Sequence, residues 1–207
     1  MTDFLEKLNL KTGDILLCDY KGSGCMGLFT KIIKCVTKSK YSHVAMILKD
    51  PSFINPSLEG LYIWESSWEG KADPQDKKVK LGVQITPLKE IYNHYKKENS
   101  HMFIKRLFSN DQITNEKLTD IHKVVYDKPY DLVLKDWIEE LREKDSKPQK
   151  TNRFWCSALI GYIYTKLDIL DPKTDWSVLR ASDFSNSCPK LKFINGCYLN
   201  NEELQIL

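Results

Sequence analysis

The sequence predicts an α+β protein that folds as one domain over residues 1–207. The predicted order is a helix, then a block of strands, then helices, which is typical of α+β folds rather than of alternating β-α-β units. No Gly/Ser-rich linker divides the chain, and 207 residues are too few for two comfortable domains. The apolar share of 42% and the charged share of 29% are those of a globular protein, which excludes disorder along the whole chain.

Apolar periodicity and turn residues place the elements of the first half of the chain. The predicted elements are a helix at Thr2–Leu10, a strand at Ile15–Cys18, a helix at Met26–Thr37, strands at Tyr41–Leu48, Leu61–Ser66 and Lys80–Thr86, and a helix from Pro87 to about Lys97. The helix at Met26–Thr37 carries one apolar stripe, and we expect the stripe to face a core. Its members are Leu28, Phe29, Ile32, Ile33 and Val36.

The second half of the chain is mainly helical. The predicted elements are a strand at Met102–Leu107, helices at Thr114–Tyr126, Leu132–Lys144 and Phe154–Leu167, and a weak strand near Leu191–Ile194. The helix at Phe154–Leu167 has the strongest pattern. Two polar segments, Lys71–Lys78 and Asp145–Lys150, are expected to form loops where a substrate would approach.

Composition narrows the classes of function. The 31 basic and 28 acidic residues nearly cancel, so the charge gives no argument for nucleic acid. No apolar run is long enough to span a bilayer, and Met1–Leu10 has no secretory apolar core, so we expect a cytoplasmic location or, for a viral source, the virion. Six cysteines without a C-x-x-C pair predict reduced thiols rather than a zinc ribbon. We expect no metal and no cofactor.

Cys156 is the first candidate for chemistry, because it lies at the opening of an apolar helix. Unpaired backbone N–H groups and the positive end of a helix favour thiolate over thiol, and the thiolate is the nucleophile. The same N–H groups can receive an oxyanion. The position alone also suits a small buried residue at a helix start.

His43 and Glu65 are the other two candidates. His43 interrupts an apolar strand, as a general base or a hydrogen-bonded core histidine does, whereas His94, His101 and His122 suit the surface. Glu65 lies among aromatic residues, where a carboxylate needs a partner unless it faces water from an edge strand. The 22 residues between the two fit neighbouring antiparallel strands, on which Glu65 would orient the imidazole of His43.

Five short segments carry a resemblance to a known family. They are Gly13-Asp14-Ile15-Leu16-Leu17, Tyr41-Ser42-His43-Val44-Ala45, Trp64-Glu65-Ser66, Pro129-Tyr130-Asp131 and Phe154-Trp155-Cys156-Ser157. The set resembles the circularly permuted papain-like proteins, most closely the YiiX-like branch with bacterial and poxviral members, which is related to NlpC-type amidases. The resemblance implies an antiparallel sheet or barrel packed against the helix of the nucleophile. It also implies Cys156 as nucleophile, His43 as base and Glu65 as third residue, with Asp14 structural.

The predicted function is a cysteine hydrolase of amide or isopeptide bonds that works through a thioester. One alternative uses the same three residues on an acyl lipid, like the related lecithin–retinol acyltransferase group. It is suggested by the helix at Met26–Thr37 and its lysines Lys31, Lys34, Lys38 and Lys40, which would touch a membrane surface. A third reading is a scaffold without catalysis. Nothing in the spacing of Cys156, His43 and Glu65 indicates a metal site.

Overall fold

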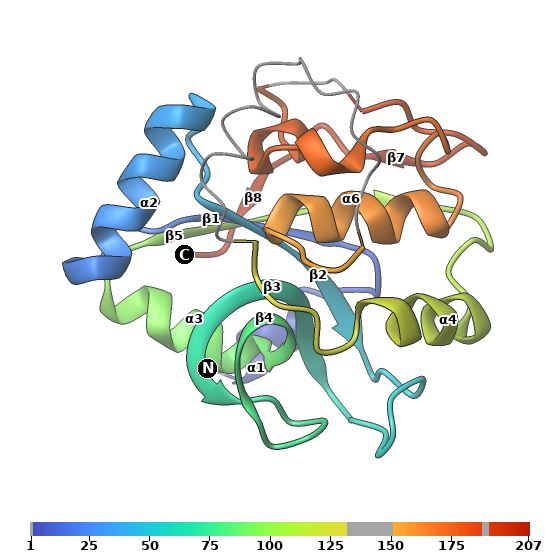
Figure 1. The fold of residues 1–207 in the computed structure, drawn as a ribbon, viewed down its shortest axis with the longest axis horizontal. Helices are drawn as coiled ribbons and strands as arrows, with labels where there is room; N and C mark the ends of the chain where they lie inside the picture. The colour runs from blue at the N-terminus through green and yellow to red at the C-terminus, as the bar shows by residue number, and fades with distance from the viewer. Residues whose placement is uncertain (1, 132–150, 188–190) are drawn as a thin grey trace.

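A computed structural model describes residues 2–131, 151–187 and 191–207 of the chain. Its centre is an antiparallel sheet of six strands in the order β4-β3-β2-β1-β5-β8 (Figure 1). The strands span Ile15–Asp19 (β1), His43–Lys49 (β2), Leu61–Ala72 (β3), Val79–Pro87 (β4), His101–Lys105 (β5) and Leu204–Gln205 (β8). A smaller sheet pairs β6, Leu107–Phe108, with β7, Tyr198–Leu199.

Helices surround this sheet, so the predicted α+β class is confirmed. The described residues form α1 (Thr2–Lys7), α2 (Gly24–Thr37), α3 (Leu88–Lys97), α4 (Asn115–Val125) and α6 (Cys156–Lys166), with two short 3-10 turns at Trp176–Val178 (η1) and Ala181–Phe184 (η2). The helix predicted at Leu132–Lys144 and the loop predicted at Asp145–Lys150 lie outside the described residues.

The sheet is open, so the alternative of a barrel is wrong. A barrel closes only when its first and last strands pair, and here β4 and β8 lie at opposite edges. The edge strand β8 has two residues and pairs with β5 alone. Such a short strand has too few backbone groups to bind a second neighbour along its length.

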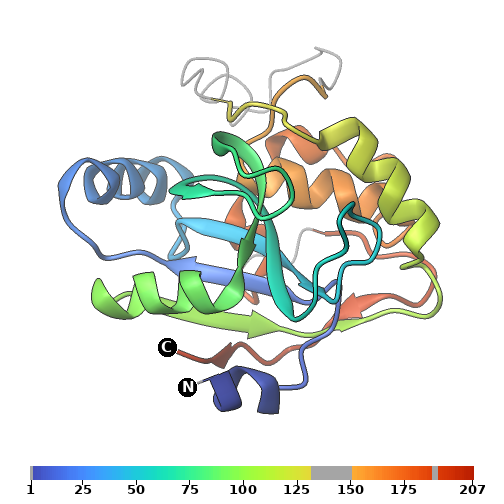
Figure 2. The ribbon, with the colours of Figure 1, turned by 90° about the horizontal axis from the view of Figure 1, so that it is seen from below.

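Both faces of the central strands are buried. Side chains alternate between the faces of a strand, and Val44 and Met46 of β2 lie in the core that contains α6. Their neighbours Ala45 and Ile47 lie in a second core with residues of α1 and α3. Figure 2 shows α6 on one side of the sheet and α1 and α3 on the other. The helix that carries the candidate nucleophile is therefore fixed against the middle of the sheet.

The segment at Lys71–Lys78 is a loop from Asp73 to Lys78, as predicted, but its first two residues belong to β3. Strand β3 continues to Ala72, and the chain then turns into β4 around Asp73. Asp73 is buried and accepts hydrogen bonds from Lys80 Nζ at 3.0 Å and from the backbone N–H of Ile85 at 3.2 Å. The polar residues that suggested a solvated loop thus include a buried ion pair that holds the β3–β4 hairpin.

Two further predictions are wrong in detail. The stretch Leu191–Ile194 makes only one bridge, between Phe193 and Leu170. The chain forms strands again only later, as β7 of the small sheet and β8 of the central sheet. On α2, Leu28 is 63% exposed and Ile32 is 41% exposed, so these two residues do not face a core. In Figures 1 and 2, α2 lies beside the sheet rather than over one of its faces. Helical periodicity alone could not reveal that both faces are covered by other helices.

We predict that Gly82→Ala lowers the free energy of unfolding by about 1–3 kcal/mol, as overpacking typically does. An added Cβ would lie 2.3 Å from the carbonyl oxygen of Lys128 and 2.8 Å from Cα of Pro129, and the backbone φ of +150° also favours glycine. Urea unfolding measures the change. Gly60→Ala is the control, because Gly60 also has a positive φ, of +101°, but its Cβ would meet no atom within 4 Å. Equal losses for both variants would contradict the steric explanation.

Candidate active site

Cys156 is the first residue of α6, as the sequence predicted. The preceding Trp155 has an extended backbone and makes no side-chain cap, so the N–H groups of the first turn are left for other acceptors. The approach to the helix is fixed from two sides. Ser66 Oγ on β3 donates to the carbonyl of Phe154 at 2.6 Å, and Ser157 Oγ donates to the carbonyl of Leu179 at 2.6 Å. The start of α6 therefore has a defined position over the sheet.

His43 and Glu65 meet across two neighbouring strands. Strands β2 and β3 pair antiparallel, and His43 Nε2 lies 2.8 Å from Glu65 Oε2. Glu65 is only 1% exposed, so the alternative of an edge carboxylate facing water is wrong. Its second oxygen accepts a hydrogen bond from Thr86 Oγ1 at 2.6 Å. The carboxylate is thus held in place from both oxygens.

Cys156 and His43 are close enough to act on each other, because each is among the causes that shift the pKa of the other. Glu65 meets the same ring at Nε2. The backbone N–H groups of Val44 and Ser157 also point to the sulfur. The structure thus brings together all three residues that the sequence singled out, from β2, β3 and the start of α6.

The charges of this arrangement favour a thiolate beside an imidazolium. Burial alone would raise the pKa of Cys156, but the hydrogen bond and charge of His43, with the N–H groups of Val44 and Ser157, outweigh it and lower the pKa. Burial likewise acts against the charged ring of His43, yet hydrogen bonds to Cys156 and Glu65, with their negative charges, raise its pKa well above the ordinary value. Each member of the pair thus stabilises the charged form of the other.

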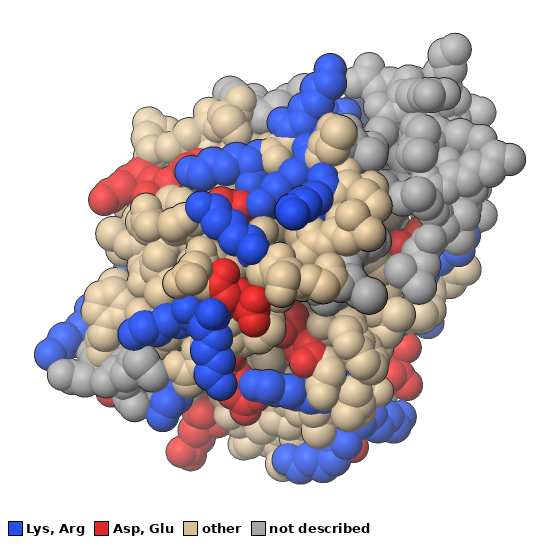
Figure 3. Space-filling view, turned by 90° about the vertical axis from the view of Figure 1, so that its left-hand side faces the viewer, with Lys and Arg blue, Asp and Glu red and all other residues tan. Residues whose placement is uncertain are grey.

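Two hollows adjoin the triad. The larger has a volume of about 640 Å³ and includes His43, whereas a hollow of about 20 Å³ includes Cys156. They share Ile33, Ser42 and Tyr130 as walls, so the hollow of the base and the hollow of the nucleophile are neighbours. Figure 3 looks onto the side of the molecule that carries α2 and α3, where acidic side chains lie near the centre and lysines surround them.

Sequence reasoning missed several residues around the triad. Thr86 donates a hydrogen bond to Glu65. The sequence could have indicated it, because Thr86 is a hydroxyl residue on the strand that follows the strand of Glu65. Tyr130 is partly buried, and the negative charge of Cys156 adds to the effect of burial in raising its pKa. His94, predicted to lie on the surface, is exposed but also lines the large hollow. Spacing in the sequence cannot reveal such neighbours, because α3 and Tyr130 reach the site only through the fold.

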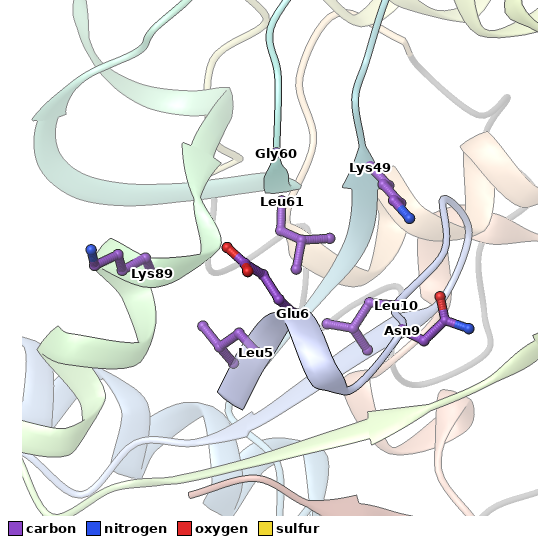
Figure 4. A pocket seen from close by; sticks show the side chains of 8 residues that line it. All are labelled: Leu5, Glu6, Asn9, Leu10, Lys49, Gly60, Leu61 and Lys89. Atoms are coloured by element: carbon purple, nitrogen blue, oxygen red, sulfur yellow. The ribbon is translucent and has the colours of Figure 1, made fainter. Parts of the chain in front are cut away.

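A second cavity, of about 370 Å³, lies between α1, the start of β3 and α3 (Figure 4). Its charged side chains are Glu6, Lys49 and Lys89. None of these is a thiol, hydroxyl or imidazole, so the lining holds no nucleophile paired with a base. The triad is therefore the better candidate for chemistry.

The described residues contain no sign of a metal site or of a membrane-spanning helix. Within the described ranges, no group of three His, Cys, Asp or Glu residues is arranged to hold a metal ion. None of the helices in the described parts of the chain is long and apolar enough to cross a membrane. Neither a scan against protein-family models nor a search of the curated proteins finds a match to this chain. The resemblance to permuted papain-like proteins therefore stays a prediction, and function has to be inferred from the geometry of the triad.

We predict that Cys156 reacts first when the protein meets limiting iodoacetamide at mildly acidic pH. Its pKa is lowered, whereas burial raises the pKa of Cys18 and Cys197. An ordinary free thiol, with a pKa of about 8.5, holds little thiolate at this pH. Mass spectrometry of all six cysteines reads the result. His43→Ala should remove the preference, and faster labelling of Cys35 than of Cys156 in the unmodified chain would exclude an activated nucleophile.

Proposed function

We propose that this protein is a cysteine hydrolase that cleaves amide bonds of a peptide or isopeptide through a thioester. The observation that carries the proposal is the placement of the His43 ring between the sulfur of Cys156 and the buried carboxylate of Glu65. A nucleophile, a base within hydrogen-bonding reach and a third group that orients the base are the parts of such a mechanism. The resemblance to permuted papain-like proteins supports the same three roles.

The thiolate of Cys156 attacks the carbonyl carbon, and the carbonyl electrons move to the oxygen. The imidazolium of His43 then gives its proton to the amide nitrogen, the C–N bond breaks, and the amine leaves. His43, now neutral, takes a proton from water, whose hydroxyl attacks the thioester and displaces the thiolate. The acid is released, and the pair of charged residues is restored.

Backbone N–H groups supply the stabilisation of the oxyanion. Those of Ser157 and Val44 already point to the sulfur, which carries negative charge before the attack. The positive end of α6 lies at the same point, and both features favour negative charge that develops on the adjacent carbonyl oxygen. Glu65 keeps the His43 ring oriented through each proton transfer.

We predict that His43→Ala lowers the turnover of a cleaved peptide by about 10²–10⁴-fold, the usual contribution of general acid–base catalysis. Glu65→Gln keeps the shape and should also lower turnover strongly, because the imidazolium loses the charge that stabilises it. A screen of fluorogenic peptide and isopeptide substrates gives the assay, and thermal melting checks the fold. Glu59→Gln, an exposed carboxylate in the loop before β3, is the matched control.

The role of Glu65 also predicts the direction in which the pH profile of kcat/KM shifts in Glu65→Gln. In the unmodified chain the pKa of His43 is raised and that of Cys156 is lowered. Glu65→Gln should lower the pKa of His43, which moves the alkaline limb of kcat/KM to lower pH. The less stable imidazolium should also raise the pKa of Cys156, which moves the acid limb to higher pH. A variant with unchanged turnover and an unmoved profile would remove Glu65 from the mechanism.

A second candidate, acyl-lipid hydrolysis or transfer with the same triad, is favoured by one feature of α2. This helix exposes Leu28 and Ile32 beside the exposed Lys31, a pattern that suits a membrane surface. It also supplies Thr30 and Ile33 to the large hollow. We rank it second because an acyl chain in that hollow would have to lie against a partly buried carboxylate, that of Glu69.

We predict negligible binding to anionic liposomes at physiological salt, since a peptide substrate requires no interfacial surface. Sedimentation with vesicles rich in phosphatidylserine measures it. The double variant Leu28→Ser and Ile32→Ser is the control, because it removes the exposed apolar surface and leaves the lysines. Saturable binding of the unmodified chain that the double variant loses would reverse the ranking of the two candidates.

A further inference from the structure

The large hollow beside the triad contains a second carboxylate, that of Glu69 on β3. Glu69 and His43 line this hollow together. The charges of Glu65 and His43 both act on Glu69, so this carboxylate lies near the triad without being one of its three residues. It is therefore in position to contact a part of the substrate other than the bond that is cleaved.

Neighbouring groups indicate where this carboxylate lies. Gln84 Nε2 donates a hydrogen bond to Ser67 Oγ at 2.7 Å, and Ser67 acts to lower the pKa of Glu69. The charge of Glu69 adds to burial in raising the pKa of Tyr20 and of Tyr95, and both tyrosines line the hollow. The carboxylate thus faces the interior of the hollow.

Glu69 lacks a full counter-ion among the described residues. Lys71 is the nearest lysine to influence it, but Lys71 Nζ is paired with Glu90 at 2.7 Å. The charge of His43 is shared with Glu65 and Cys156. Burial and the charge of Glu65 accordingly raise the pKa of Glu69 to about 8. A desolvated carboxylate in this state is stabilised most by a cation that enters the hollow.

The other walls suit the apolar stem of a long basic side chain. Trp68 of β3 and Leu81 of β4 are cross-strand neighbours, and they are 47% and 41% exposed. Tyr20 stacks on His94 with ring centroids 5.7 Å apart, and both line the same hollow. Aromatic faces attract cations, and methylene groups pack on such surfaces. The apolar and aromatic walls and the carboxylate of Glu69 therefore both favour a long side chain that ends in a positive charge.

We propose that the hollow is a specificity site for a lysine or arginine side chain of the substrate, with Glu69 as its counter-ion and Trp68 and Leu81 against its stem. This inference rests on the proposed function for its peptide substrate. It makes Glu69 a residue of substrate selection, whereas Glu65 orients His43.

Two chloroacetamides that differ only at the far end of one arm test the proposal. N-(5-aminopentyl)chloroacetamide carries an ammonium group, and N-(5-hydroxypentyl)chloroacetamide carries a neutral hydroxyl. We expect the ammonium reagent to alkylate Cys156 about ten- to a hundredfold faster, which is the value of a charge-assisted contact. Glu69→Gln should reduce this ratio to near one, whereas Glu59→Gln should leave it unchanged.

The ratio should also depend on pH. Below about pH 8 the empty hollow holds mainly protonated Glu69, so the ratio should rise from pH 6 to pH 9 and stay flat in Glu69→Gln. Changes in the Cys156 thiolate cancel, because both reagents use the same warhead. The groups that face Glu69 or act on it are Glu65, Lys71 with Glu90, His43, Cys18, Tyr20, His94 and Tyr95.

A binding measurement separates this proposal from the proposed function. The Cys156→Ala protein is titrated with the peptides Ac-AAKAA-NH₂ and its norleucine analogue, and NMR shifts of the hollow are followed. We expect the lysine peptide to bind at least tenfold more tightly, and Glu69→Gln to remove the difference. Equal binding of both peptides together with equal alkylation ratios would overturn the specificity site while leaving an activated Cys156 intact. Selective binding with an unreactive Cys156 would instead overturn the hydrolase and keep the site.

Discussion

The pairing of Cys156 with His43 depends on one constraint, the fixed contact of the start of α6 with β2. The sulfur has to reach the His43 ring and the N–H of Val44 together, which requires the first turn of the helix to lie directly over that strand. Ser66 holds the carbonyl of Phe154, and Phe154 is itself fully buried, so the helix cannot slide along the sheet. The chemistry of the site is thus a consequence of core packing.

The register of β2 with β3 supplies the second part of the site. It places Glu65 within hydrogen-bonding distance of His43, and β4 then brings Thr86 to the other oxygen. A carboxylate that is 1% exposed would be costly without these partners. A shift of the β2–β3 register by one residue would turn Glu65 to the opposite face of the sheet. The orientation of the His43 imidazole therefore depends on the register of the two strands.

Negative groups outnumber positive ones around His43. The thiolate of Cys156 and the carboxylate of Glu65 share one imidazolium, and Glu69 adds a further carboxylate along β3. Burial and the charge of Glu65 raise the pKa of Glu69, and the negative charges of Cys156 and Glu65 raise that of His43 in spite of its burial. The carboxylate of Glu69 makes the large hollow acidic, unlike an apolar tunnel for acyl chains. The groups that would serve the reaction and the groups that would select the substrate are therefore neighbours.

The sequence by itself named the three candidate residues and the elements that carry them, because helix-start position, strand periodicity and a carboxylate among aromatic residues are local properties. It placed Cys156 at a helix start and put His43 and Glu65 on paired strands, and it also determined the α+β class. Only the tertiary structure decided that the three meet, that the sheet stays open, and that Leu28 is exposed. These three features depend on contacts between segments that are far apart in the sequence. The periodicity of one segment does not show which other segment packs against it.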